Sequence, residues 1–506
     1  MKRLYFLILS ALFLSEIGLA QNTELPTFIT DSLDKYIEQS LKDWNVPATA
    51  VGIVKDGKII YQKAFGVKDI QSNETVDENT LFMIGSNTKA FTGTSLAMLE
   101  YQGKCSLNDK VIKWLPQFKL KDSAWTKQAN LVDLLSHRMG FETFQGDLLS
   151  FDSDLSEDEY IEKNGKITPL YDFRTKWGYS NAGFMMAGKC IESISGSSWE
   201  DYFRTNILKP LKMDHTVITV SEIREAQNAT IAHSIVDNKL AIIDYGGLDL
   251  VGPAASISSS ISDMNKWTLA LLNPENGVVP NQAIQRTRKP ESIKGFGRHA
   301  YNKSNYNLYG LGWELSDYES KKLVSHTGGV HGYLTSVTLI PEENLAVVVL
   351  TNTDQNWLFV ALKWEIVDAF LKLPYRNYSE TWSKAFKQNS ARDSAILAVL
   401  KDSVKLELKP EISLAQFAGK FKNEVYGYAE LVVENDHLKL SLEHHPDGKG
   451  RLDYIGNHRF LCLYTDPTFG TKVFPFSYDE NKVKSFTLSV NDFWEFTSYE
   501  FHKVSQ

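Results

Sequence analysis

Ile84-Gly85-Ser86-Asn87-Thr88-Lys89 is a short segment that places a serine and a lysine about one helical turn apart. The residues after it, 90–99, are mostly apolar and predict a buried helix, so Ser86 and Lys89 lie on one face. A serine hydroxyl is a weak nucleophile until a base takes its proton, and a lysine is such a base only when it is neutral. Burial and nearby positive charge favour that neutral state. The segment alone also fits an N-capping serine beside a solvated lysine.

Tyr179-Ser180-Asn181 is a second polar segment, and it precedes another apolar helical run at 184–194. A tyrosine hydroxyl can pass a proton between a serine, a lysine and a leaving group. The amide of Asn181 can hydrogen-bond a substrate carbonyl. A plain loop before a helix, with asparagine as its cap, is the alternative interpretation.

Ser325-His326-Thr327-Gly328-Gly329 is the third segment, and a predicted strand at 335–340 follows it closely. Glycines let a backbone approach a substrate, and a backbone N–H on such an edge can donate to an oxyanion. His326 and His331 suggest a metal pair, but no carboxylate or cysteine lies nearby at ligand spacing. We therefore predict a site without a metal or an organic cofactor.

In this order and spacing, the three segments resemble motifs of the serine β-lactamase and penicillin-binding-protein superfamily. The similarity is to its class C-like branch of β-lactamases, D,D-peptidases, D-aminopeptidases and esterases. It extends from about residue 28 to residue 372 and includes the stretches 134–137, 207–213, 252–255 and 309–313. The resemblance implies an α/β lobe, with helices flanking an antiparallel sheet, beside an all-α lobe. Strand-forming stretches at 49–54, 58–65, 337–340 and 345–351, and helical ones at 27–44 and 357–371, fit this architecture.

The resemblance also implies how catalysis would proceed. Ser86 is the expected acylated nucleophile, Lys89 the group that activates it, and Tyr179 the general acid and base. The N–H groups of Ser86 and Gly329 are the expected oxyanion hole. The implied reaction is hydrolysis through a covalent acyl-enzyme.

Asn181, His326 and Thr327 are the expected substrate-binding residues. His326 occupies the place of the lysine in the superfamily's K-T-G motif. A charged lysine binds the carboxylate of a penicillin or of a D-Ala-D-Ala end electrostatically, whereas histidine is mostly neutral at pH 7. We therefore expect a small ester, an amide or a D-amino-acid peptide as substrate, for example one derived from the cell wall. A true β-lactamase or D,D-carboxypeptidase, and a non-catalytic protein that binds cell-wall peptides, are the alternatives.

The composition is that of a globular protein, with 43% hydrophobic and 23% charged residues and a net charge of −8. No strongly basic block is present, so we expect no nucleic-acid partner. Lys2 and Arg3, the apolar run 4–14 and the small residues 18–20 predict a secretory signal peptide over residues 1–20. We expect an exported protein, periplasmic or secreted, with no membrane span after the signal is removed. The oligomeric state is left open.

Three segments are predicted after the signal peptide: a hydrolase-like domain at 21–375, a linker at 376–412 with a helix at 391–404, and an all-β domain at 413–506. Strands are expected at 426–433, 437–442, 459–464, 484–490 and 494–501, and this domain resembles the lipocalin-like β-barrel often appended to these hydrolases. His444 and His445 are interpreted as solvated loop residues. The three cysteines allow one disulfide, but small buried thiols are the expectation: Cys105, Cys190 and Cys462.

Overall fold

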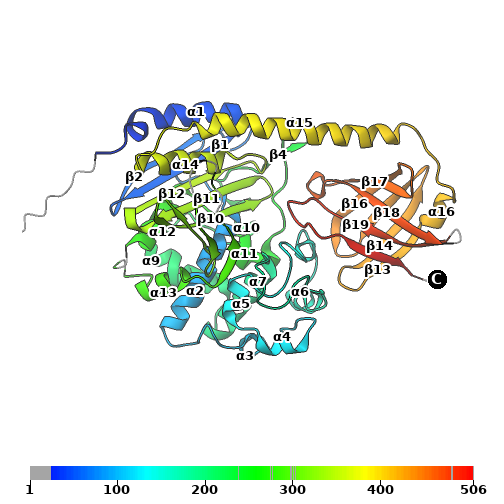
Figure 1. Ribbon diagram of the computed structural model, residues 1–506, viewed down its shortest axis with the longest axis horizontal. Coiled ribbons are helices and arrows are strands. Elements are labelled where there is room, and N and C mark those ends of the chain that lie inside the picture. Colours follow the sequence, from blue (N-terminus) through cyan, green and yellow to red (C-terminus); the bar gives the residue numbers. More distant parts are fainter. Residues whose placement is uncertain are drawn as a thin grey trace, which may run out of the picture.

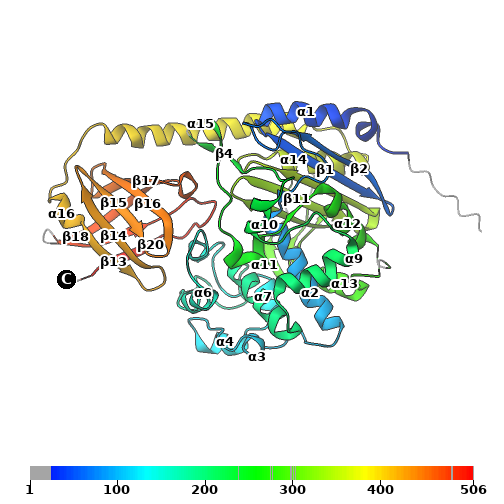
Figure 2. The same cartoon turned by 180° about the vertical axis from the view of Figure 1, so that it is seen from behind.

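The computed structural model describes residues 24–236, 239–273, 275, 277–296, 299, 301, 304–479 and 482–504, so the predicted signal peptide lies outside the described residues. Figure 1 shows three parts: a sheet with helices on its faces, a helical lobe below it, and a barrel at the side. Figure 2 shows the same arrangement from behind, with the barrel next to the helical lobe. No helix within these ranges is long and apolar enough to cross a membrane.

The main sheet is antiparallel and has eight strands in the order β2-β1-β12-β11-β10-β9-β8-β7. β1 (Ala48–Lys55) and β2 (Lys58–Gly66) form the hairpin whose turn is Asp56-Gly57, a dipeptide that favours tight turns. The interior strand β12 (Leu345–Thr351) is apolar up to its last residue, and all of it is buried, as expected of a strand covered on both faces. The other strands are β11 (Tyr333–Ile340), β10 (Lys321–Val330), β9 (Glu314–Tyr318), β8 (Asn307–Tyr309) and β7 (Ser292–Gly295).

Helices cover both faces of this sheet. On one face, α1 (Leu33–Trp44), α14 (Leu358–Phe370) and the start of α15 (Tyr378–Val404) share an apolar cluster with sheet residues such as Val51 and Val347. On the other face, α12 (Ile261–Leu272) packs on β1 and β12. These elements confirm the predicted α/β lobe and the helices expected at 27–44 and 357–371.

The helical lobe is built around two helices. α2 (Thr88–Tyr101) is buried from its start to Leu99, and α7 (Asn181–Ser195) packs against it. Shorter helices begin with capping boxes, as α5 does at Asn130 and α6 at Ser156. The other helices outside the barrel are α3 (Val111–Trp114), α4 (Ser123–Gln128), α5 (Leu131–Leu135), α6 (Glu157–Asn164), α8 (Trp199–Phe203), α9 (Lys209–Leu211), α10 (Val220–Glu225), α11 (Gly252–Ala255) and α13 (Asn281–Thr287). Two small antiparallel pairs are β3 (Phe82–Met83) with β6 (Ser258–Ser259), which are distant in sequence, and β4 (His233–Val236) with β5 (Lys239–Ile242), which are consecutive.

α15 is one continuous helix of 27 residues that fills most of the segment described above as a linker. It is longer than the helix expected at 391–404. Its first turn is fixed to the sheet domain, because Trp44 donates to Ser379 Oγ over 3.0 Å and Tyr378 donates to buried Asp368 over 2.8 Å. The helix then runs toward the barrel and contacts β17 (Arg459–Tyr464), as Figure 1 shows.

The C-terminal domain is a closed barrel of eight strands, β13 to β20 in sequence order, entered through α16 (Leu414–Phe417). The strands expected at 426–433, 437–442, 459–464 and 484–490 are confirmed. The strand expected at 494–501 is wrong over its first half: β20 begins only at Tyr499, because residues 489–498 leave the barrel as a loop. The strands besides β17 are β13 (Gly419–Asn423), β14 (Gly427–Glu434), β15 (His437–Leu442), β16 (His445–Tyr454), β18 (Thr471–Asp479), β19 (Lys482–Leu488) and β20 (Tyr499–Lys503).

The barrel lies directly against the helical lobe. His445 Nδ1 is 2.9 Å from the carbonyl oxygen of Phe151, and His444 Nδ1 is 3.0 Å from Asp154 Oδ1. His445 is buried and His444 half-buried, so the interpretation of both as solvated loop residues is wrong. The reason is a contact between domains, which local sequence does not reveal. Burial lowers the pKa of His445 to about 4, so its ring is neutral at pH 7.

All three cysteines are free thiols. Cys190 in α7 and Cys462 in β17 are buried, as expected, whereas Cys105 is partly exposed. The fold therefore depends on packing and hydrogen bonding rather than on disulfides.

Candidate active site

Ser86 lies in the turn before α2, at a cleft between the sheet and the helical lobe. Gly85 has a φ of +54°, a left-handed conformation that favours glycine. A Cβ at Gly85 would lie 2.9 Å from the nitrogen of Gly329, and a Cβ at Gly328 would lie 1.9 Å from the carbonyl oxygen of Ile84. Both glycines are therefore needed for β10 to approach the turn that carries Ser86. This close approach brings the first and third sequence segments together.

Lys89 is fully buried, one turn after Ser86. Its Nζ lies 3.1 Å from Ser86 Oγ, 2.6 Å from Asn181 Oδ1 and 3.1 Å from the carbonyl oxygen of Ala254. Burial lowers the pKa of Lys89 from 10.5 to about 7, against the opposing effect of the nearby Asp147 carboxyl. A substantial fraction of the amine is therefore neutral at pH 7 and able to accept the serine proton.

Tyr179 precedes α7 and brings the second sequence segment to the same point. Its hydroxyl hydrogen-bonds Ser86, and its ring centre lies 4.5 Å from Lys89 Nζ. Burial raises the pKa of Tyr179 well above 10, although the bond to Ser86 acts in the opposite direction. The phenol therefore keeps its proton at neutral pH, which suits it to relay a proton rather than to serve as a phenolate base.

Asn181 is held between Lys89 and a carboxyl group that the sequence analysis did not identify. Its side-chain carbonyl accepts from Lys89, and its amide donates to Asp147 Oδ2 over 2.6 Å. Asp147 is buried, and both this burial and the nearby Glu495 raise its pKa. Asn181 is thereby fixed in orientation, with its second amide hydrogen left for another acceptor.

Gly329 lies on an open edge of the sheet. β9 pairs with β10 only as far as Ser325, opposite Glu314, and no other described strand continues the pairing on that side. Thr327, Gly328 and Gly329 line the cleft together with Ser86. Unpaired backbone N–H groups of such an edge can donate to an oxyanion, which is the role predicted for Gly329.

His326 lines the cleft, but both of its ring nitrogens have partners within the protein. Nε2 lies 2.9 Å from the hydroxyl of Tyr309, and Nδ1 lies 2.6 Å from the carbonyl oxygen of Thr327. Burial lowers the pKa of His326 to about 4, although Glu314 acts to raise it. The ring is therefore neutral at pH 7 and does not hold a carboxylate by charge. The neighbouring residue Thr327 is exposed and lines the cleft.

The cleft has a volume of about 400 Å³, and much of its wall is aromatic. Lys294 also lines it, but this lysine forms an ion pair with Glu314 and lies 4.9 Å from the centre of the Trp177 ring. Its charge is thus balanced inside the cleft. The aromatic lining consists of Phe144, Trp177, Tyr179, Phe359, Phe493 and Trp494.

The barrel forms one side of this cleft, a feature that the sequence analysis missed. The β19–β20 loop (residues 489–498) extends from the barrel, and Asp492, Phe493 and Trp494 line the cleft. Trp494 stacks on Phe151 of the helical lobe, with ring centres 3.9 Å apart. The alternating aromatic residues at 494–501 predicted a strand, and nothing in that pattern indicates that half of it packs on another domain.

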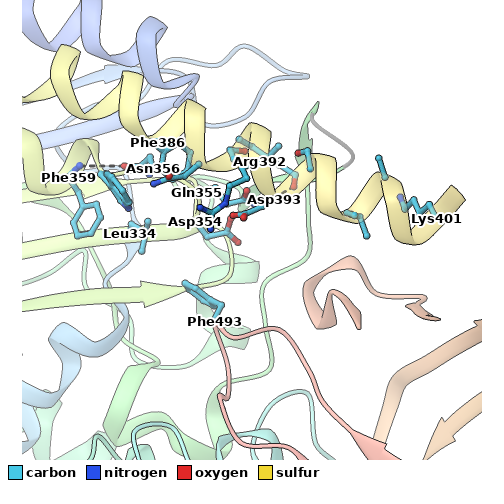
Figure 3. A pocket seen from close by; sticks show the side chains of 17 residues that line it. Leu334, Asp354, Gln355, Asn356, Phe359, Phe386, Arg392, Asp393, Lys401 and Phe493 are labelled. Carbon is cyan, nitrogen blue, oxygen red and sulfur yellow. Dashed lines mark hydrogen bonds between the residues drawn. The ribbon is translucent and has the colours of Figure 1, made fainter. Parts of the chain in front are cut away.

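A larger groove of about 1020 Å³ lies beside the cleft, along α15. Leu334, Phe359 and Phe493 line both spaces. Figure 3 shows Phe493 at the tip of the β19–β20 loop, pointing toward Leu334 and Asp354. Phe493 therefore stands between the cleft and the groove.

His331, the second histidine of the third segment, lies outside the cleft wall and is buried. Its ring centre is 4.2 Å from that of Trp494, so it packs at the contact with the barrel. The described residues contain no group of three or more His, Cys, Asp or Glu side chains that could hold a metal ion.

Known proteins resemble this chain in both sequence and fold. Protein flp of Staphylococcus aureus (strain N315) is 27% identical over 348 residues, which cover 66% of this chain and 66% of flp, just under two thirds of its length. Unguisins hydrolase ungD of Aspergillus violaceofuscus (strain CBS 115571) is 23% identical over 459 residues, or 82% of this chain and 78% of that protein. The octameric penicillin-binding protein homologue from Pyrococcus abyssi shares the fold, with a TM-score of 0.58 and 19% identity over 93% of this chain and 99% of its own.

The beta-lactamase family model matches residues 33–370, the whole of the sheet and helical lobe described above. Members of this superfamily are generally serine hydrolases. With its family motifs brought together at one cleft, the chain belongs to the beta-lactamase family.

Proposed function

We propose that this protein is a serine hydrolase that transfers the acyl group of a small ester, an amide or a D-amino-acid peptide to Ser86 and then to water. The observation that carries the proposal is the buried amine of Lys89, 3.1 Å from Ser86 Oγ at an open cleft. The hydrogen bond between Tyr179 and the same serine supports it.

In the acylation half, Lys89 Nζ accepts the proton of Ser86 while Ser86 Oγ forms a bond to the substrate's carbonyl carbon. The carbonyl electron pair moves to oxygen, and the N–H groups of Ser86 and Gly329 stabilise this oxyanion. When the electron pair on the oxyanion re-forms the carbonyl double bond, the bond between the carbonyl carbon and the leaving group breaks. The leaving oxygen or nitrogen takes a proton from Tyr179, which recovers one from Lys89.

In the deacylation half, a water molecule attacks the ester carbon of acylated Ser86 and gives its proton to the Tyr179–Lys89 pair. The second oxyanion collapses, the bond to Ser86 Oγ breaks, and that oxygen takes the proton back. The acid product leaves and the resting side chains are restored. No net proton is stored on the protein.

The cleft favours a substrate without an essential carboxylate. His326 is neutral, and Lys294 is already paired with Glu314. Aromatic walls and a volume of about 400 Å³ suit a small, largely apolar acyl or amino-acid group. Similarity to a protein named unguisins hydrolase supports hydrolysis as the reaction class.

We also propose that the protein acts outside the cytoplasm after removal of residues 1–20. The support is the sequence itself: two basic residues, an apolar run and small residues before Gln21. A fragment of the cell wall is a substrate that such a location would supply.

Labelling with a fluorophosphonate tests the nucleophile, since this reagent traps an activated serine. The wild-type protein and a Ser123→Ala control, which alters an exposed serine of α4, should be labelled, and Ser86→Ala should not. Labelled Ser86→Ala would refute the assignment, and an unlabelled wild type would favour the non-catalytic alternative. Turnover of an activated ester, a D-amino-acid amide and a chromogenic cephalosporin then separates the substrate classes. Rapid cephalosporin turnover would favour a true β-lactamase.

A further inference from the structure

Glu495 is a buried carboxyl group on the barrel that the catalytic steps do not use. Its side chain is on the β19–β20 loop and only 2% of the residue is exposed. It accepts hydrogen bonds from the backbone N–H of Gly146 at 2.7 Å and of Leu148 at 3.0 Å, both in the helical lobe. It also accepts from the hydroxyls of Tyr426 and Tyr499 in the barrel.

The two N–H groups that bind Glu495 flank Asp147. Asp147 accepts from the amide of Asn181 over 2.6 Å, and Asn181 in turn accepts from Lys89 over 2.6 Å. An unbroken series of short contacts therefore runs from the barrel to the amine beside Ser86. A shift of the loop at 146–148 would move Asp147 and be passed through Asn181 to Lys89, because the Asn181 side chain is hydrogen-bonded to Asp147 at one end and to Lys89 at the other.

The charges along this series act on one another. Burial raises the pKa of Glu495 to about 7, and the Gly146, Leu148 and tyrosine bonds oppose this effect. Glu495 in turn raises the pKa of Asp147, and Asp147 acts to raise the pKa of Lys89. The titratable groups around Glu495 are Asp147, Tyr160, Tyr426 and Tyr499.

We propose that Glu495 is a positioning residue through which the barrel sets the place of Asp147 and Asn181, and so the place and protonation of the Lys89 amine. The inference rests on the proposed function, since Lys89 matters for rate only if Ser86 is acylated. It gives the barrel a part in acylation beyond lining the cleft.

The opposing view is that Glu495 only holds two domains together. His444 provides a matched control, because it also joins the barrel to the lobe, through Asp154. Among the described residues, Asp154 forms no hydrogen bond or ion pair with Asp147, Asn181 or Lys89. If both contacts only hold the domains together, Glu495→Gln and His444→Ala should change the pH profile of hydrolysis to the same extent. Loss of a positioning contact should affect Glu495→Gln alone.

The experiment compares the pH profile of kcat and kcat/KM for ester hydrolysis in the wild type, Glu495→Gln and His444→Ala. Glu495→Gln should lower kcat by about tenfold to a hundredfold with little change in KM, the size expected for a displaced catalytic group. The acid limb of the profile, where the rate falls because Lys89 becomes protonated, should move to higher pH. Without the negative charge of Glu495, Asp147 ionises more readily, and the Asp147 carboxylate then raises the pKa of Lys89. His444→Ala should keep the wild-type acid limb.

Glu495→Gln with a wild-type kcat and acid limb would overturn the inference, as would an equal shift in His444→Ala. If Glu495→Gln does not fold, Tyr499→Phe replaces it: this change removes one hydroxyl bond to the carboxylate, and the acid limb should move in the same direction by less. An unmoved limb in that variant would also refute the inference. A wild type without Ser86-dependent hydrolysis would instead overturn the proposed function, and this inference with it.

Discussion

Replacing Lys89 by methionine tests whether the amine is neutral in the folded protein. Methionine keeps an unbranched chain of similar length but has no titratable group. The pKa of Lys89 changes from 10.5 to about 7 on burial, a difference of about 3.5, which corresponds to about 5 kcal/mol between the limits of low and high pH. This quantity is measurable as a pH dependence of stability.

The sign follows from proton binding. Between pH 7 and pH 10.5 the unfolded lysine carries a proton that the folded one does not, so the free energy of unfolding of the wild type rises with pH. The slope for one such proton is about 1.4 kcal/mol per pH unit. Relative to Lys89→Met, the wild type should therefore gain about 2 kcal/mol between pH 8 and pH 9.5. Well below pH 7 Lys89 carries its proton in both the folded and the unfolded state, so it adds no further pH dependence there.

Urea denaturation followed by tryptophan fluorescence at several pH values measures this difference. The second buried lysine, Lys363, whose pKa is also lowered to about 7, is present in both proteins and cancels. Lys127→Met, at an exposed position of α4, is the control and should leave the pH dependence as in the wild type. A stability difference between wild type and Lys89→Met that does not change with pH would mean that Lys89 stays charged, and the proposed base would be refuted.

Two further predictions concern the β19–β20 loop and the N-terminus. Phe493→Ala should join the cleft to the groove along α15. The kcat/KM for long-chain esters should then rise relative to the kcat/KM for acetyl esters. The expected gain is about 0.8 kcal/mol, or about fourfold, for each methylene group that becomes buried in the groove. An unchanged chain-length preference in Phe493→Ala would show that this ring does not limit the cleft. The exported protein should begin at Gln21 by intact mass, and an exported form that retains Met1 would contradict signal cleavage.

The catalytic segments could be predicted because each has a local pattern. Ser86 and Lys89 lie one helical turn apart before an apolar run, and the glycines of the third segment mark a place where backbones approach. The sheet strands and most barrel strands follow from apolar runs and turn residues in the same way. The period of apolar residues and the spacing of motif residues can be read from the sequence because each is a property of a single helix or strand.

The supporting residues could not be predicted, because their roles arise between distant parts of the chain. Gly146 and Glu495 are 349 positions apart, yet they share a hydrogen bond. Asp147 matters because Asn181 faces it, and Trp494 leaves the expected strand because Phe151 offers a stacking surface. Tertiary packing overrode the local β pattern at that point.

The length of α15 has a consequence for how such a protein can change over evolutionary time. An α-helix of 27 residues extends about 40 Å and turns about 100° per residue. With its first turn locked at Ser379, one inserted residue in the middle would swing the whole barrel around the helix axis and carry Phe493 and Glu495 away from Ser86. Substitutions on its solvent side are tolerated far more easily than a single insertion or deletion. Related proteins that keep a barrel-lined cleft should therefore preserve the number of residues in this helix, while the identities of its exposed residues vary.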